Sequence, residues 1–226
     1  VDTVEAAVEA VREKTTSRTV ALYVSTPSNP TGRVLPEAWL TALAEFAQAE
    51  NLWLLSDEVY EDFIFRGEHF SMGRVAPERT LSTFSFSKAY GMAGNRCGYM
   101  IGPAEAIDQS RKIGTHTFYG APTSGQLAAL RALSDGAPWQ DNARESYRAA
   151  SKNAAAVLGV PEPEGSTFFF LNVAHKLDGR GMTGFLEDCF EDGVLVAPGL
   201  SSGNDYGTWV RLCYTAMPPD ETAAAV

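Results

Sequence analysis

Side chains that could do chemistry stand at three points in the first half of the chain, each directly after a short apolar run. They are Asn29 in SNPTG, Asp57 and Tyr60 in SDEVY, and Ser85, Ser87 and Lys88 in SFSK. A lysine that is shielded from water and lies near cations loses its proton easily, so it can act as a nucleophile and then as a base. Arg96, which follows Lys88 in the sequence, adds a planar, fork-shaped donor for an anion.

The apolar runs before these residues are predicted to be strands of one sheet, with helices between them. The expected strands are residues 20–25, 52–55, 80–86 and 97–102. Residues 1–14 and the segment that begins at Pro36 have apolar side chains at helical spacing. Because successive clusters are about 30 residues apart, each interval fits one strand–helix–strand crossover. The pattern predicts an α/β fold with a mostly parallel sheet, helices on both faces, and polar groups at the carboxyl ends of the strands.

The second half of the chain changes character after Pro103. Its expected helices are residues 104–113, 122–134, 138–158, 183–192 and a segment after Pro218, and its expected strands are 166–174, 194–197 and 208–214. We therefore expect residues 1–137 to belong to a large α/β domain. Residues 138–226, which begin with a long linking helix, are expected to form a small α+β domain.

A glycine-rich segment in this half of the chain has the spacing of a nucleotide-binding motif without the surrounding elements of one. Residues 179–184 match G-x-G-x-x-G, the pattern of a dinucleotide-binding turn. No parallel strand–helix–strand unit with a suitably placed acidic residue surrounds them, so we expect a loop there.

Composition and charge exclude several classes of protein. The chain carries 18 basic and 28 acidic side chains, and the net charge of −10 provides no basic footprint for nucleic acid or for an anionic membrane. No apolar run approaches the roughly 18 residues of a membrane-spanning helix. The cysteines are far apart and odd in number, which favours a reducing cytoplasm over a disulfide framework. The histidines are isolated in the sequence, so no metal site is expected.

The order of the motifs carries a resemblance to a known family. NPTG, SDEVYEDF, SFSKAYGMAGNRCGY and the later VRL follow one another as in fold-type I enzymes that use pyridoxal phosphate (PLP). The chain most closely resembles the class I and II aminotransferases, the aspartate-aminotransferase-like family. The resemblance implies a homodimeric enzyme that transfers an amino group between an L-amino acid and a 2-oxo acid through a lysine aldimine.

The resemblance also implies roles around the pyridine ring of the cofactor. Lys88 would form the Schiff base and move the proton during transfer, and Asp57 would pair with the ring nitrogen. Tyr60 and Asn29 would donate hydrogen bonds to the ring 3-oxygen. A carboxylate beside the ring nitrogen keeps that nitrogen protonated, which lets the ring withdraw electrons from the reacting carbon.

Further roles concern the two anions that such an enzyme binds. By the same resemblance, Ser85, Ser87 and Arg96 would hold the cofactor phosphate. Arg211 would bind the substrate carboxylate with help from Asn29. Arginine suits this role because it offers two parallel N–H groups to a carboxylate.

Each of these residues also has a purely structural interpretation. Asp57 can cap a helix, Asn29 can form a turn, and Tyr60 can simply pack. Lys88 can be a solvated helix residue, and the two arginines can form ion pairs or lie on the surface.

Other functions with the same fold stay open at this stage. Elimination, cyclisation and decarboxylation use the same cofactor-binding residues, and a non-catalytic regulatory module can retain the lysine. The family's preceding half supplies a phosphate loop and an aromatic residue that stacks on the ring, and residues 1–19 contain neither. We therefore expect the chain to be a fragment that needs the rest of the protein for a complete site, and we expect residues 1–226 alone to aggregate or bind PLP poorly.

Overall fold

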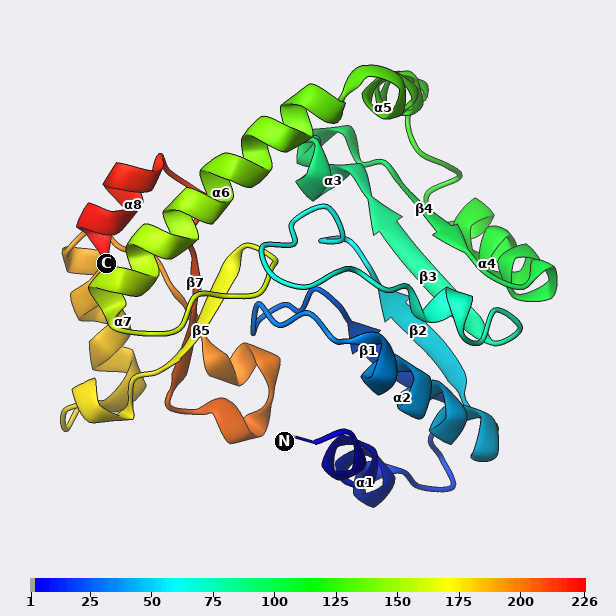
Figure 1. Ribbon diagram of the computed structural model, residues 1–226, viewed down its shortest axis with the longest axis horizontal. Helices are drawn as coiled ribbons and strands as arrows, with labels where there is room; N and C mark the ends of the chain where they lie inside the picture. The colour runs from blue at the N-terminus through cyan, green and yellow to red at the C-terminus, as the bar shows by residue number, and fades with distance from the viewer. Residues whose placement is uncertain (1–2) are drawn as a thin grey trace. The chain divides into compact units, whose positions relative to one another are not determined.

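The chain divides into two compact units in a computed structural model that describes residues 3–226 (Figure 1). The first unit comprises Val1–Pro27, Val34–Asp62 and Gly67–Gln140. The second comprises Ser28–Arg33, Phe63–Arg66 and Asp141–Val226. No helix among the described residues is long and apolar enough to cross a membrane.

The first unit is built on a four-stranded sheet in the order β1-β2-β3-β4 (Figure 1). Its strands are β1 (Ala21–Ser25), β2 (Trp53–Asp57), β3 (Thr80–Ser85) and β4 (Gly98–Ile101). The first three run parallel, and β4 pairs antiparallel with β3. The prediction of a mostly parallel α/β sheet is therefore confirmed, with an antiparallel strand at one edge.

Helices flank this sheet along the chain. They are α1 (Val4–Lys14), α2 (Glu37–Ala49), α3 (Phe86–Ala89), α4 (Ala104–Thr117) and α5 (Thr123–Asp135). In α2 the apolar residues recur at helical spacing, so Leu40, Leu43 and Ala47 are buried together against Leu54 of β2. The helix ends at Ala49 with Glu50 as its C-cap, and Asn51 follows in the left-handed region with φ of 53°, a conformation that asparagine tolerates.

The two faces of the sheet differ in burial. Val24, Leu54 and Ser82 lie on the face that packs on the core and are buried. Side chains alternate between faces along a strand, so Tyr23 and Leu55 point to the other face. Tyr23 is 60% exposed and Leu55 is 37% exposed in the described residues. The carboxyl ends of the strands thus border an open face of the sheet.

The second unit contains a three-stranded antiparallel sheet in the order β5-β7-β6. Its strands are β5 (Phe168–Asn172), β6 (Ala197–Pro198) and β7 (Trp209–Cys213), and its helical elements include α6 (Ala137–Leu158), α7 (Gly181–Glu191) and α8 (Pro219–Ala225). Small residues of α6, Ala150 and Ala154, let the helix approach Phe169, Leu212 and Tyr214 in one buried cluster.

Two short segments from the first half of the chain pack in the second unit. The carbonyl of Gly32 accepts hydrogen bonds from Glu164 N at 3.0 Å and Gly165 N at 2.9 Å. Ser166 N donates to the carbonyl of Phe63 at 2.9 Å. These backbone hydrogen bonds explain why residues 28–33 and 63–66 separate from their sequence neighbours, although the sequence places them within a domain of residues 1–137.

Two local predictions differ from the structure. In place of the strand expected at residues 194–197, the structure has only the two-residue strand β6 (Ala197–Pro198). Val194 belongs instead to the turn that ends α7, because its N–H donates to the carbonyl of Cys189 and Gly193 has φ of 82°. The loop expected at 179–184 is confined to residues 179–180, since residues from Gly181 onward belong to α7. The side chain of Asp178 accepts from Arg180 N at 2.8 Å and starts this helix with a tight turn.

Candidate active site

The polar residues predicted from SDEVY and SFSK lie at the carboxyl ends of neighbouring strands. Asp57 is the last residue of β2, and Ser85 is the last residue of β3. The strands are parallel, and Asp57 pairs in register with Thr83. Lys88 follows in the short helix α3. The fold therefore places a carboxylate, a hydroxyl and an amine at one edge of the sheet of the first unit.

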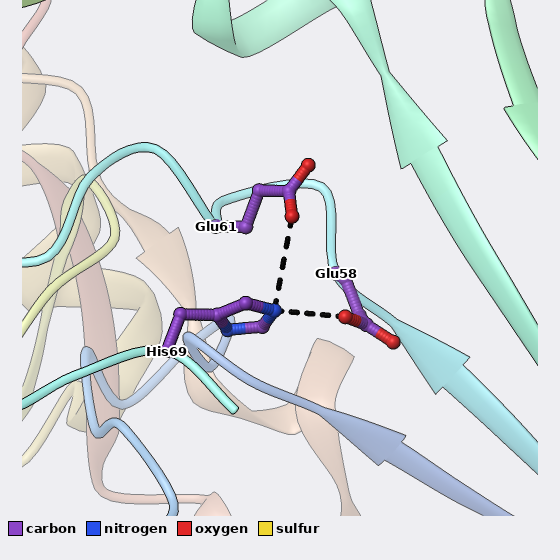
Figure 2. Close-up of side chains that lie close together, drawn as sticks. All are labelled: Glu58, Glu61 and His69. Carbon is purple, nitrogen blue, oxygen red and sulfur yellow. Dashed lines mark hydrogen bonds and ion pairs between the residues drawn. The ribbon is translucent and has the colours of Figure 1, made fainter. Parts of the chain in front are cut away.

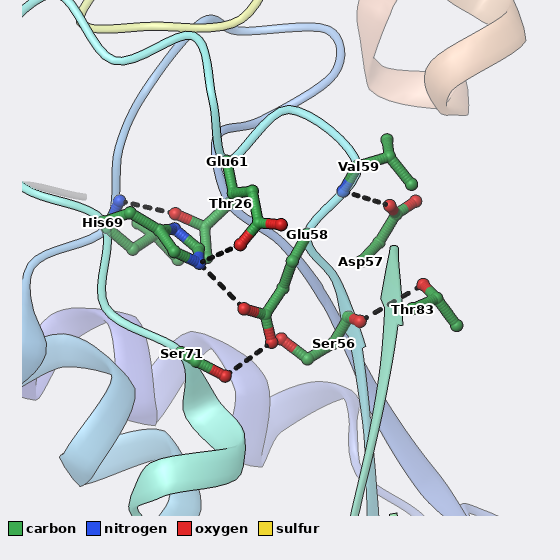
Figure 3. Close-up of polar contacts among 10 residues, drawn as sticks. Thr26, Ser56, Asp57, Glu58, Val59, Glu61, His69, Ser71 and Thr83 are labelled. Carbon is green, nitrogen blue, oxygen red and sulfur yellow. Dashed lines mark hydrogen bonds and ion pairs between the residues drawn. The ribbon is translucent and has the colours of Figure 1, made fainter. Parts of the chain in front are cut away.

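Asp57 is held by two donors on its two carboxylate oxygens. Tyr23 Oη donates to Asp57 Oδ2 at 2.6 Å. Val59 N lies 3.4 Å from Oδ1, as Figure 3 shows. No helix begins after Asp57, so it does not act as a helix cap. No local sequence pattern indicates Tyr23, because its contact with Asp57 depends on the register between β1 and β2.

Lys88 and Tyr60 lie near each other in the first unit. Tyr60 is only 4% exposed, whereas Lys88 is exposed. The Lys88 Nζ atom lies 6.0 Å from the centroid of the Tyr60 ring, at the outer limit of a cation–π contact. An amine and a phenol are thus within reach of one small ligand.

Hydroxyl and guanidinium groups surround the start of α3 and β4. Ser85 Oγ accepts from Ser87 N at 3.1 Å and caps α3, which leaves the Ser85 O–H proton available to a ligand. Arg96 has φ of 51° and donates from Nη1 to the carbonyl of Ala93 at 2.9 Å. Among residues 3–226 the structure shows no ion pair of Arg96.

The remaining predicted residues, Asn29 and Arg211, meet in the second unit. Arg211 Nη1 donates to Asn29 Oδ1 at 2.9 Å. The guanidinium carbon of Arg211, on β7, lies 4.5 Å from the centroid of the Phe168 ring on the neighbouring β5. Asn29 lies in a turn closed by the hydrogen bond from Gly32 N to Ser28 O at 3.0 Å. Two residues that are far apart in the sequence are therefore joined by a side-chain hydrogen bond.

A buried acidic cluster follows Asp57 directly. Glu58 is fully buried, and its two oxygens accept from Ser71 Oγ and contact His69 Nε2, each at 2.8 Å (Figure 3). Glu61 Oε2 lies 3.8 Å from the same nitrogen (Figure 2). The place of His69 in the sequence suggested an isolated residue, but in the structure it contacts two glutamates. One carboxylate oxygen each of Glu58 and Glu61 and one ring nitrogen of His69 lie within 4.8 Å of one another, a spacing that could also hold a metal ion. The contacts of His69 with the two glutamates account for this spacing.

The two glutamates of this cluster differ in their proton affinity. Burial raises the pKa of Glu58, but hydrogen bonds from His69 and the surrounding serines outweigh this effect and bring the pKa below its ordinary value. Burial, with the nearby charge of Asp62, raises the pKa of Glu61 to about 7. The cluster therefore anchors the segment that follows Asp57 with one ionised carboxylate and carries a second that titrates near neutrality.

The first unit offers part of the donor set that PLP requires. Asp57 supplies an acceptor for a protonated ring nitrogen, and Lys88 supplies an amine for an aldehyde. Ser85, Ser87 and Arg96 supply hydroxyl and guanidinium donors for a phosphate group. These residues are compatible with the cofactor in chemical type and in their common position at the ends of β2 and β3.

Fold and donor set together define the class of protein: an α/β chain with a carboxylate at the end of one strand and a lysine amine just after the adjacent parallel strand. The family model for aminotransferase class I and II matches residues 1–226. The chain belongs to this family.

Named relatives extend the comparison. An aspartate/prephenate aminotransferase of Thermus thermophilus is 36% identical over 214 residues, covering 91% of this chain and 54% of that protein. An arginine–pyruvate transaminase of Pseudomonas aeruginosa is 32% identical, covering 88% of this chain and 51% of that protein. The structure of Thermus thermophilus aspartate aminotransferase with maleate matches with a TM-score of 0.86 and 35% identity, over 96% of this chain and 58% of that one. The chain thus spans about half the length of the curated relatives it matches.

Proposed function

We propose that the protein is a PLP-dependent aminotransferase that moves an amino group between an L-amino acid and a 2-oxo acid. The observation that carries the proposal is the position of Asp57 and Lys88 at the carboxyl ends of β2 and β3, in a chain of this family. PLP, when bound, supplies an electron-withdrawing ring that stabilises negative charge on the substrate carbon.

Lys88 is proposed as the covalent and proton-transferring residue. Its Nζ would condense with the aldehyde carbon of PLP, forming a carbon–nitrogen double bond with release of one water. Released from that bond by the substrate amine, the same nitrogen would take and return the proton at the substrate carbon. Asp57 would hold the proton on the ring nitrogen through a charge-assisted hydrogen bond.

The other residues are proposed to bind and orient. Ser85, Ser87 and Arg96 would hold the phosphate, and the O–H of Tyr60 would donate to the ring 3-oxygen. The burial of Tyr60 supports this role, because a buried phenol is held in one orientation.

Arg211 is proposed to bind the substrate carboxylate, and Asn29 is proposed to assist it and to donate to the ring 3-oxygen. The hydrogen bond between Arg211 and Asn29 supports the first of these roles, because it fixes the guanidinium plane while other N–H groups remain for a carboxylate.

A panel of amino donors tests the proposed reaction. The purified full-length protein is mixed with PLP and single L-amino acids, and the cofactor absorbance and the products are followed. Transamination predicts loss of the cofactor band and one equivalent of 2-oxo acid, and a second substrate should restore the band. Release of ammonia or carbon dioxide instead would assign the chain to elimination or decarboxylation chemistry.

The family resemblance also bears on the domains, the oligomeric state and the cellular location of the protein. We propose that residues 1–137 belong to the large domain and 138–226 to the small domain of a homodimer, as the family resemblance implies. The absence of a disulfide-type cysteine spacing supports a reducing cytoplasm. Sedimentation of the full-length protein tests the dimer.

A further inference from the structure

We propose that Tyr23 is a positioning residue for Asp57: its phenol O–H holds the carboxylate in the orientation that Asp57 needs toward the ring nitrogen of the cofactor. The inference rests on the proposed role of Asp57. Tyr23 lies outside the SDEVY, SFSK and NPTG motifs, and nothing in the spacing of the sequence connects it with them.

The contact itself is short and direct. Tyr23 Oη and Asp57 Oδ2 are 2.6 Å apart, a distance typical of an O–H group that donates to an ionised carboxylate. The other oxygen, Oδ1, has the longer contact of 3.4 Å with Val59 N. The phenol is therefore the stronger of the two constraints on the carboxylate.

Strand geometry explains why the contact is well defined. Strands β1 and β2 are parallel, with Ser25 opposite Asp57 and Tyr23 opposite Leu55. Tyr23 and Asp57 consequently point to the same face of the sheet as diagonal neighbours, which an aromatic side chain can span. Both ends of the hydrogen bond stand on regular strands, and such sites hold their geometry better than loops do.

The phenol remains a donor over the physiological range. Partial burial raises the pKa of Tyr23 to about 12, and the hydrogen bond and negative charge of Asp57 act in the same direction. The ring itself is 60% exposed among the described residues. The hydrogen bond that carries the proposed role is the short O–H contact with Asp57.

A double-mutant cycle on the full-length holoenzyme tests this role. Tyr23→Phe removes only the O–H group, and Asp57→Asn removes the carboxylate charge. The dissociation constant for PLP and the pH dependence of the bound cofactor's absorbance are measured for both single variants, the double variant and the parent. Single-turnover rates with a saturating amino donor complete the set.

Tyr23→Phe should raise the PLP dissociation constant about tenfold and lower the single-turnover rate by a similar factor, the size expected for one hydrogen bond to a charged group. The absorbance pH profile should shift in the same variant, and the donor concentration for half-saturation should stay within about twofold. In the Asp57→Asn background the same change should alter each quantity by less than about twofold, because the partner is already lost.

Tyr99→Phe is the matched control, since it removes a phenol O–H from the edge strand β4 of the same sheet, where Tyr99 stacks on Phe84. It should leave the absorbance pH profile unchanged. Equal effects of Tyr23→Phe in both backgrounds, or no effect in the parent background while Asp57→Asn is disabling, would overturn the role of Tyr23 alone. If Asp57→Asn itself leaves PLP affinity and rate unchanged, the proposed function of Asp57 fails as well.

Discussion

At the scale of single residues, Arg211 is the proposed contact for the substrate carboxylate. Arg211→Leu should weaken binding of the amino donor by roughly 100-fold or more, since a charge-assisted pair with a carboxylate is lost. The cofactor absorbance should stay normal. Donor titration of the holoenzyme measures this effect, and Arg148→Leu on the exposed side of α6 is the control. Unchanged donor affinity in Arg211→Leu would contradict the assignment.

Glu61 gives a second prediction at this scale, on stability. In the folded chain the pKa of Glu61 is raised to about 7, whereas its ordinary pKa is near 4.5. Between these two pH values the folded chain keeps a proton on Glu61 that the unfolded chain has released. Stability should therefore fall as the pH rises from about 4.5 to 7. Glu61→Gln should remove this loss and stabilise the protein by about 1 kcal/mol near pH 8, a figure reduced for the partial exposure of the side chain.

Denaturant unfolding of the full-length protein across this pH range measures the effect of Glu61→Gln. The two proteins should be equally stable below about pH 4, because Glu61 is then protonated in both the folded and the unfolded chain and is uncharged like glutamine. Glu68→Gln, at an exposed position in the same segment, is the control. A constant difference at every pH would show that Glu61 does not titrate in this range.

At the scale of elements, α5 supports the loop that carries Arg96. A Cβ atom added at Gly125, in the first turn of α5, would stand 2.6 Å from the carbonyl oxygen of Asn95, the residue before Arg96. Alanine usually favours a helix by up to about 1 kcal/mol over glycine. Gly125→Ala should instead push the loop away and raise the PLP dissociation constant several-fold. Ser124→Ala, at the exposed neighbouring position, should leave PLP affinity unchanged.

The strands of the first unit could be predicted from the sequence, but several side-chain contacts within that unit could not. The apolar runs and turn residues predict β1, β2 and β3, and with them the common edge on which Asp57, Ser85 and Lys88 lie. Contacts that depend on strand register could not be predicted in this way. Tyr23 reaches Asp57, and His69 reaches Glu58, only because neighbouring segments meet at a particular offset that no local pattern specifies.

At the scale of the whole molecule, the second unit is discontinuous in sequence. Residues 28–33 and 63–66 supply hydrogen bonds to the segment at 164–166, and the Phe63 ring lies 4.9 Å from that of Tyr147. A chain of residues 141–226 alone lacks these partners and exposes their apolar contacts. It should unfold without a sharp thermal transition, as followed by circular dichroism. A cooperative transition in that isolated segment would show that the two inserted loops are dispensable.

The most direct test of the account as a whole is the site of covalent attachment. The full-length protein is loaded with PLP, reduced with borohydride and digested, and the peptides are mapped by mass spectrometry. The account predicts a phosphopyridoxyl group on Lys88, and loss of that label in Lys88→Ala. A label on one of the chain's other lysines (Lys14, Lys112, Lys152 and Lys176) in place of Lys88, or a holoenzyme that carries no reducible bond to Lys88, would contradict it.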